Sequence, residues 1–225
     1  MTRRTNARIA GLTFLLYIAV AFPSMVLSAK ATGGESNAAP LLSIAQHTTD
    51  MRITILLELA SGFCALVLAV TLYGITRDED RELAMLGFAC RVGEGLAGAF
   101  PLTTLGLLWL ATNAGPGAPD PASANALAAY LLKVGTWQTL SASLLFAAGS
   151  TVFAFLLLRG RMVPVPLAWL GVLGSALLVV ILPLQLAGFI TVTELVWVPV
   201  GLFELTLAPW LLIKGVAEPA RRQST

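Results

Sequence analysis

The sequence predicts an all-α fold, an integral membrane bundle of six transmembrane helices. Composition is the first reason: the 225-residue chain is 57% hydrophobic and 12% charged, with a mean hydropathy of +0.83. A soluble domain is nearer half apolar and a quarter charged, so this chain has too little polar surface to dissolve alone. The second reason is the presence of six long apolar blocks. The third is the alternating character of the segments between those blocks.

Each apolar block is long enough to cross a bilayer, which takes about 20 residues in a helix. A helix satisfies its own backbone hydrogen bonds, and lipid offers no substitute for them. We expect the blocks to form a single membrane domain over residues 1–225, with the lipid bilayer as its main partner and its oligomeric state left open. The expected spans are residues 9–28, 53–75, 83–111, 137–158, 167–187 and 195–213.

The basic residues predict the orientation of the bundle. Ten of them lie in the N-terminus, residues 76–82, residues 159–166 and the C-terminal tail, whereas the two longer linkers hold three. Because Lys and Arg are enriched on the cytoplasmic side, both termini are expected in the cytoplasm and the protein in the cytoplasmic (inner) membrane. The net charge of +2 is small and scattered, which argues against a nucleic-acid partner.

The first block has an alternative interpretation. The sequence TRRTNAR, an apolar run and Ala29-Lys30-Ala31 together resemble a signal peptide with its cleavage site. The run of about 20 residues is longer than the usual ~7–15 of a signal peptide, so we expect a retained helix.

The two longer linkers each contain a proline that favours a helix start. Pro40 and Pro121 precede amphipathic segments, and proline is well suited to the first turn of a helix. We therefore expect the second and fourth helices to extend beyond the bilayer on the outer side.

The third block contains Gly93-Glu94-Gly95-Leu96-Ala97-Gly98, which matches the dinucleotide-binding pattern G-x-G-x-x-G. That fingerprint needs a preceding strand and a helix that opens at the glycines. Here we expect one continuous apolar helix, so we interpret the glycines as a packing stripe, since small residues let helices approach closely. The stripe comprises Gly87, Arg91, Glu94, Gly95 and Gly98. Similar faces are expected on the second helix (Glu58, Ser61, Gly62, Ala65, Ala69) and on the sixth (Gly201, Glu204, Ala208).

Four ionisable residues lie inside the expected spans, and they carry the functional hypotheses. A charge at the bilayer centre costs about 2.5–3.5 kcal/mol on insertion scales, so these residues must pair or become neutral. One hypothesis is a binding or transport protein whose pocket among the second, third and sixth helices takes a small polar ligand or a proton. The alternative is a structural or accessory subunit whose buried charges only fix helix packing. The candidate site residues, including one amide, are Glu58, Arg91, Glu94, Gln138 and Glu204.

An intramembrane enzyme is the third hypothesis and has the least support. The sequence lacks H-E-x-x-H, C-x-x-C, G-x-S-x-G and the P-loop pattern. We therefore assign no catalytic residue, no metal site and no cofactor.

Several segments resemble a known bacterial family of multi-pass membrane proteins. They are RIAGLTFLLYIAVA, LVLAVTLYGI, LAMLGFACRVGEGL, PLAWLGVL and FELTLAPWLLIKGV. The family is domain of unknown function 4386, and the resemblance extends from about Arg8 to Val216. It implies a helical integral membrane protein with a retained first helix, and it implies no activity, substrate or cofactor.

The topology can be checked with reporters. A reporter fused after Thr225 and another inserted at residues 77–81 should both read cytoplasmic, because these segments carry the excess of basic residues. A reporter inserted at residues 114–119 should read external. If the C-terminal reporter and the one at 114–119 fall on the same side, the count of six spans is wrong.

Overall fold

A computed structural model describes residues 2–33, 40–113, 115 and 117–217. Within these residues all regular structure is helical, and six helical units are long and apolar enough to cross a membrane. The sequence prediction of an all-α six-helix membrane bundle is confirmed. The long helices are α1 (Arg3–Thr32), α3 (Thr48–Thr76), α4 (Arg81–Gly98), α6 (Pro121–Arg159), α7 (Val165–Leu186) and α8 (Val198–Ile213), and the short ones are α2 (Pro40–Gln46), α5 (Leu102–Thr112) and η1 (Glu194–Trp197).

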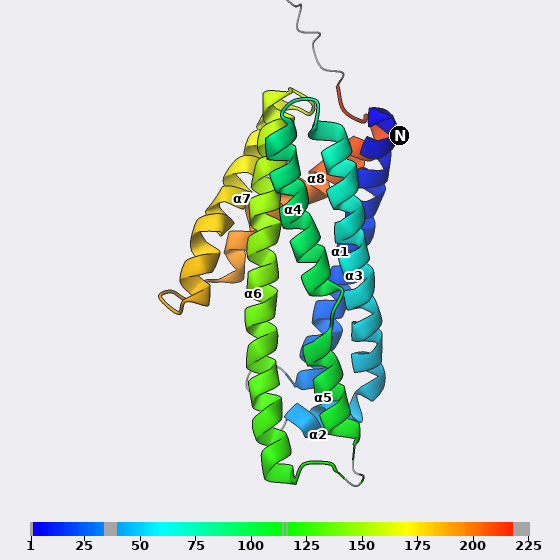
Figure 1. The fold of residues 1–225 in the computed structure, drawn as a ribbon, viewed down its shortest axis with the longest axis vertical. Coiled ribbons are helices and arrows are strands. Elements are labelled where there is room, and N and C mark those ends of the chain that lie inside the picture. Colours follow the sequence, from blue (N-terminus) through cyan, green and yellow to red (C-terminus); the bar gives the residue numbers. More distant parts are fainter. Residues whose placement is uncertain (1, 34–39, 114, 116, 218–225) are drawn as a thin grey trace, which may run out of the picture.

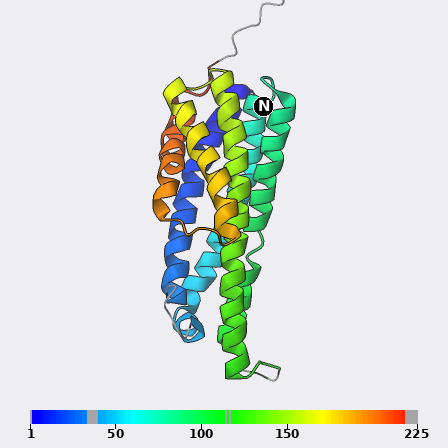
Figure 2. The same ribbon diagram turned by 90° about the vertical axis from the view of Figure 1, so that its left-hand side faces the viewer.

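The helices differ in length, and this divides the bundle into two sections. With 39 residues α6 is about 58 Å long, whereas the 22 residues of α7 cover about 33 Å. Figure 1 shows α6 along the whole length of the molecule, with α7 and α8 beside only the half that carries the N-terminus. Figure 2 shows the same difference from the side, where α6 continues well below the end of α7. The six-helix section, which we call the membrane section, matches a bilayer core of about 30 Å in length, and the distal section is the part of the bundle beyond it.

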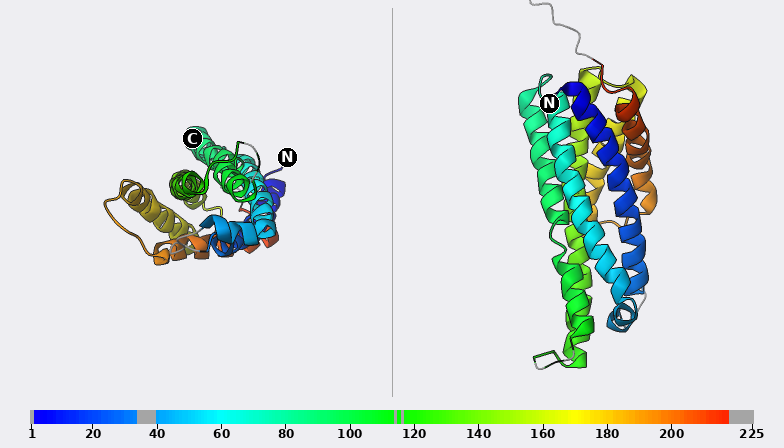
Figure 3. Two further views of the ribbon diagram at one scale, coloured as in Figure 1. Left: turned by 90° about the horizontal axis from the view of Figure 1, so that it is seen from below. Right: turned by 90° about the vertical axis from the view of Figure 1, so that its right-hand side faces the viewer.

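The distal section has an apolar core of its own. It is built from α2 and α5 and from the adjoining ends of α1, α3 and α6. An ion pair of 2.8 Å between Lys30 and Asp50 joins the end of α1 to the start of α3, and these two helices lie side by side (Figure 3). The buried core residues of the distal section are Ala31, Ile44, Met51, Leu107, Leu110 and Ala128.

The two expected helix extensions have different structures. The fourth span is one unbroken helix from Pro121, and the side chain of Asp120 caps it by accepting hydrogen bonds from the Ala122 and Ser123 backbone N–H groups. Pro40 also begins a helix, but this is the separate α2, which ends before the non-helical His47 (φ −120°, ψ 35°). The expectation that the helix from Pro40 is continuous with the second span is therefore wrong.

The N-terminus and both short turns lie at one end of the bundle, which we call the basic end (Figure 1). There Arg159, at the end of α6, makes ion pairs of 3.2 Å with Glu79 and 3.1 Å with Asp80, which fix the turn between α3 and α4. Asp80 also caps α4 by accepting a hydrogen bond from the Leu83 backbone N–H, and this bond lowers the pKa of the Asp80 carboxyl. Which side of the membrane this end faces stays a prediction.

The third span is broken, contrary to the continuous helix expected from the sequence. Helix α4 ends at Gly98 and α5 begins at Leu102. The cause is Pro101, which has no N–H to donate to the Ala97 carbonyl and whose ring clashes with that carbonyl in a helix. The side-chain amide of Gln138 on α6 donates to the freed Ala97 carbonyl at 3.0 Å, so the break does not leave this carbonyl unpaired.

The small residues of α3 and α4 bring these two helices into backbone contact. A Cβ atom placed on Gly62 would lie 2.6 Å from the Ala99 backbone N and 2.8 Å from the Gly95 carbonyl oxygen. Of the expected stripe on α4, Gly87, Arg91, Glu94 and Gly95 are buried, whereas Gly98 is partly exposed. The stripe on the last span is only partly as expected, because Gly201 has nothing within 4 Å of where a Cβ would stand.

These contacts predict different effects on stability for the same change, glycine to alanine, at two positions. Gly62→Ala should lower the melting temperature in detergent, because the new methyl group meets backbone atoms that cannot rotate away, and overpacking costs about 1–3 kcal/mol. Gly201→Ala is the matched control and should be neutral or slightly stabilising, because the space is open and alanine favours a helix by about 0.5–1 kcal/mol. Equal melting temperatures for the two variants would contradict the close packing of α3 on α4.

Candidate functional site

Arg91 lies at the centre of the membrane section with only 1% of its surface exposed. Its Nη1 donates to Glu94 on the same helix, at 2.9 Å to Oε2 and 3.3 Å to Oε1. Its Nη2 donates to the Ser150 hydroxyl on α6 at 3.1 Å and to Glu204 Oε1 on α8 at 3.3 Å. One guanidinium group therefore joins α4, α6 and α8.

A fourth helix, α1, is joined through Glu94. The Tyr17 hydroxyl donates to Glu94 Oε1 at 2.9 Å. We call Tyr17, Arg91, Glu94, Ser150 and Glu204 the ionic cluster. Its four helices are far apart in the sequence, so the cluster fixes contacts that local chain connectivity does not.

Aromatic rings and a glycine shape the space for the guanidinium. The Arg91 Cζ lies 4.6 Å from the centre of the Phe146 ring and 5.9 Å from that of Phe14, within the range of cation–π attraction. On α6, a Cβ added to Gly149 would lie 3.2 Å from Arg91 Cγ, so the glycine leaves room for the aliphatic part of the side chain. Ser150 lies nine positions before Arg159 on α6, which places the cluster about 14 Å from the basic end and near the middle of the membrane section.

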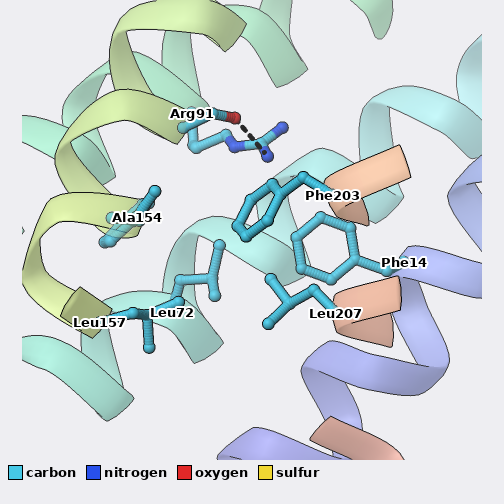
Figure 4. A pocket seen from close by; sticks show the side chains of 9 residues that line it. Phe14, Leu72, Arg91, Ala154, Leu157, Phe203 and Leu207 are labelled. Carbon is cyan, nitrogen blue, oxygen red and sulfur yellow. Dashed lines mark hydrogen bonds between the residues drawn. The ribbon is translucent and has the colours of Figure 1, made fainter. Parts of the chain in front are cut away.

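The cluster borders a very small cavity. Its volume is about 10 Å³, and Arg91 and Ser150 supply its polar lining. Figure 4 shows Arg91 beside the apolar side chains that line the rest of the cavity. Glu94 and Glu204 do not line it, and within the described residues the Arg91 Nε has no hydrogen-bond partner. Such a volume holds about one water molecule, and it is too small for an organic ligand. The other lining residues are Phe14, Leu72, Phe153, Ala154, Leu157, Phe203 and Leu207.

The charges of the cluster do not balance. Within the described part of the chain, one guanidinium group faces the carboxyl groups of Glu94 and Glu204, whose side chains are 6% and 9% exposed. With both carboxyl groups ionised, the cluster carries one net negative charge in a region that penalises charge. It becomes neutral when it also holds one proton.

The other two candidate residues from the sequence lie apart from the cluster. Glu58 accepts a hydrogen bond of 3.1 Å from the Thr104 hydroxyl on α5, and its Oε2 has no partner among the described residues. Gln138 binds backbone carbonyls at the break in the third span. The pocket was expected among the second, third and sixth spans, but the cluster joins the first, third, fourth and sixth.

Sequence reasoning missed Tyr17 and Ser150. The signal for Tyr17 was available, because a tyrosine within a long apolar run needs a partner for its hydroxyl group. Ser150 follows Gly149 on the face that packs against α4, but serine also occurs in membrane helices with its hydroxyl bound to its own helix. Among the described residues, no three His, Cys, Asp or Glu side chains gather as metal ligands.

Removing Arg91 should destabilise the protein. Arg91→Ala leaves two buried carboxyl groups without their cation, and breaking a buried pair costs about 3–5 kcal/mol. We expect a lower melting temperature in detergent than for the parent, whereas Arg8→Ala, which removes an exposed arginine, should have little effect.

A second substitution in the Arg91→Ala background identifies the more important pair. Glu204→Gln should restore more stability than Glu94→Gln, because Glu94 keeps the hydrogen bond from Tyr17 and Glu204 loses the one from Arg91. An Arg91→Ala protein as stable as the parent, or one that neither glutamine substitution changes, would contradict this view of the cluster.

Comparison with known proteins places the chain in a family. A family model described as Domain of unknown function (DUF4386) matches residues 9–215, which confirms the resemblance seen in the sequence. No curated protein and no solved structure matches the chain. Since the match covers most of the 225 residues, the chain belongs to the DUF4386 family of proteins.

Proposed function

We propose that this protein is a structural or accessory subunit of the cytoplasmic membrane, a single domain whose ionic cluster fixes the packing of its helices. The observation that carries the proposal is the closed state of the cluster. The cavity beside Arg91 measures about 10 Å³, and the three charged residues are at most 7% exposed. A site that binds and releases a polar ligand needs more room than this.

The bonding pattern supports the same function. In lipid the hydrophobic effect does not drive helices together, so packing and interhelical hydrogen bonds hold a bundle. Arg91 uses two of its nitrogens on three different helices, and Tyr17 adds a fourth helix through Glu94. Alternative packings of these helices would leave charges unpaired in lipid, so the cluster selects one arrangement.

Proton transfer is a second candidate function, and the charge imbalance favours it. One guanidinium group facing two carboxyl groups is neutral only with an added proton. A proton also needs no larger cavity than the one beside Arg91. This candidate retains the hypothesis of an intramembrane site built from Arg91, Glu94 and Glu204, whereas a larger ligand has no support.

One experiment separates the two candidates. The purified full chain is reconstituted into liposomes that enclose a pH-sensitive dye, and a pH gradient with a membrane potential is applied. A structural subunit should give the same slow leak as protein-free liposomes. The Glu204→Gln variant, which removes one of the two carboxyl groups, should then behave like the parent.

Proton flux above the protein-free control that is abolished by Glu204→Gln would overturn the structural proposal in favour of proton transfer. A flux that Glu204→Gln leaves unchanged would indicate a leak that does not pass through the cluster. Quantitative protein incorporation and an added protonophore serve as controls for both variants.

A further inference from the structure

The turn between α3 and α4 contains a basic hollow at the end of the bundle. The hollow has a volume of about 350 Å³ and is lined by Tyr73, Arg77, Asp78 and Arg81. Its charged lining consists of two guanidinium groups and one carboxylate. Arg77 approaches Asp78 only to 3.8 Å, and both side chains are more than half exposed, so this pair is weak.

Three further acidic residues lie near the hollow, and two of them pair with Arg159, whereas Glu82 is exposed next to Arg81. Glu79 and Asp80 pair with Arg159 at 3.2 Å and 3.1 Å. One guanidinium group thus balances one of these two negative charges. The residues that line the hollow carry one net positive charge, from Arg77 and Arg81 against Asp78.

Below the hollow, the outer faces of the two helices are apolar. On α3, Val70, Tyr73 and Arg77 follow the spacing i, i+3 and i+7, which places them on one face. Val70 is 55% exposed. This face runs from a charge at the helix end, through an aromatic ring, to an exposed apolar side chain.

Helix α4 carries the same three kinds of side chain, with the apolar and aromatic ones in the reverse order. Arg81, Met85 and Phe88 follow the spacing i, i+4 and i+7, and Met85 is 46% exposed. The rings of Tyr73 and Phe88 contact each other, with their centres 5.7 Å apart, and so join the two faces. On both helices the positive charge lies at the helix end and the aromatic and apolar side chains lie deeper, as the charged headgroup and apolar acyl chains of a lipid do.

We propose that this hollow binds the phosphate of an anionic phospholipid between Arg77 and Arg81, with the acyl chains along Val70 and Met85. Guanidinium groups bind phosphate oxygens through charge-assisted hydrogen bonds, and anionic lipids attract basic residues at the membrane surface. A free phosphate ion carries the same charged group, but it would leave the apolar faces of α3 and α4 uncovered.

The proposal is tested by native mass spectrometry of the full chain in a neutral detergent, titrated with phosphatidylglycerol. We expect one saturable lipid site, with weaker binding of phosphatidylcholine, which has no net charge. Arg77→Gln with Arg81→Gln should weaken phosphatidylglycerol binding roughly 10- to 30-fold. Arg4→Gln with Arg8→Gln is the matched control, because it removes two exposed arginines from the same end, and it should bind like the parent.

Two further arms identify the source of the phosphate group. Excess inorganic phosphate should not displace the lipid, and Val70→Ser with Met85→Ser should weaken lipid binding although both arginines remain. Displacement by inorganic phosphate at comparable concentration would show a free-phosphate site and overturn the proposal. Equal binding of the two lipids, or unchanged binding by the Arg77→Gln and Arg81→Gln variant, would also overturn it. The single Arg81→Gln variant, checked by circular dichroism, replaces the double variant if the latter does not fold.

Discussion

The packing of the membrane section depends on the burial of the Arg91 guanidinium group. A charged group 1% exposed in the middle of a bundle forces every neighbouring helix to supply either a partner or space. Glu94, Glu204 and Ser150 supply partners, whereas Gly149 supplies space. The glycine on α6 and the acid on α8 therefore answer the same requirement, although Glu204 lies 113 residues from Arg91 in the chain.

The need of buried polar groups for hydrogen-bond partners also explains how the break in the third span is tolerated. Pro101 frees the Ala97 carbonyl, and in lipid a free carbonyl costs several kcal/mol. Gln138 pairs with that carbonyl from the neighbouring α6. A break in one helix is thus matched by a polar side chain on another, so Gln138 has a structural role that its sequence context alone does not reveal.

The sequence was sufficient for the number of spans, because apolar block length is a direct physical requirement of a bilayer. It was also sufficient for the buried stripe on α4, because Gly87, Arg91, Glu94 and Gly95 share one helical face. The break could have been predicted from Pro101, but the continuous run of apolar residues favoured the interpretation as one unbroken helix. The candidate residues named from the sequence included Arg91, Glu94 and Glu204, but they also included Glu58, because helix order around the bundle decides which acid reaches Arg91. The spacing of residues along a helix shows which face is buried, but it does not show which other helix packs against that face.

The unequal helix lengths place parts of one chain in different solvents. The distal section, with Ile44, Met51 and Leu107 in its core, extends beyond the length of a bilayer. Burial of apolar surface from water stabilises such a core, and that driving force weakens on cooling. The membrane section gains little from the hydrophobic effect, since lipid tails are as apolar as its own side chains. Low temperature should therefore loosen the distal section while the ionic cluster keeps its packing, and the two ends of α6 should differ in their response to cold.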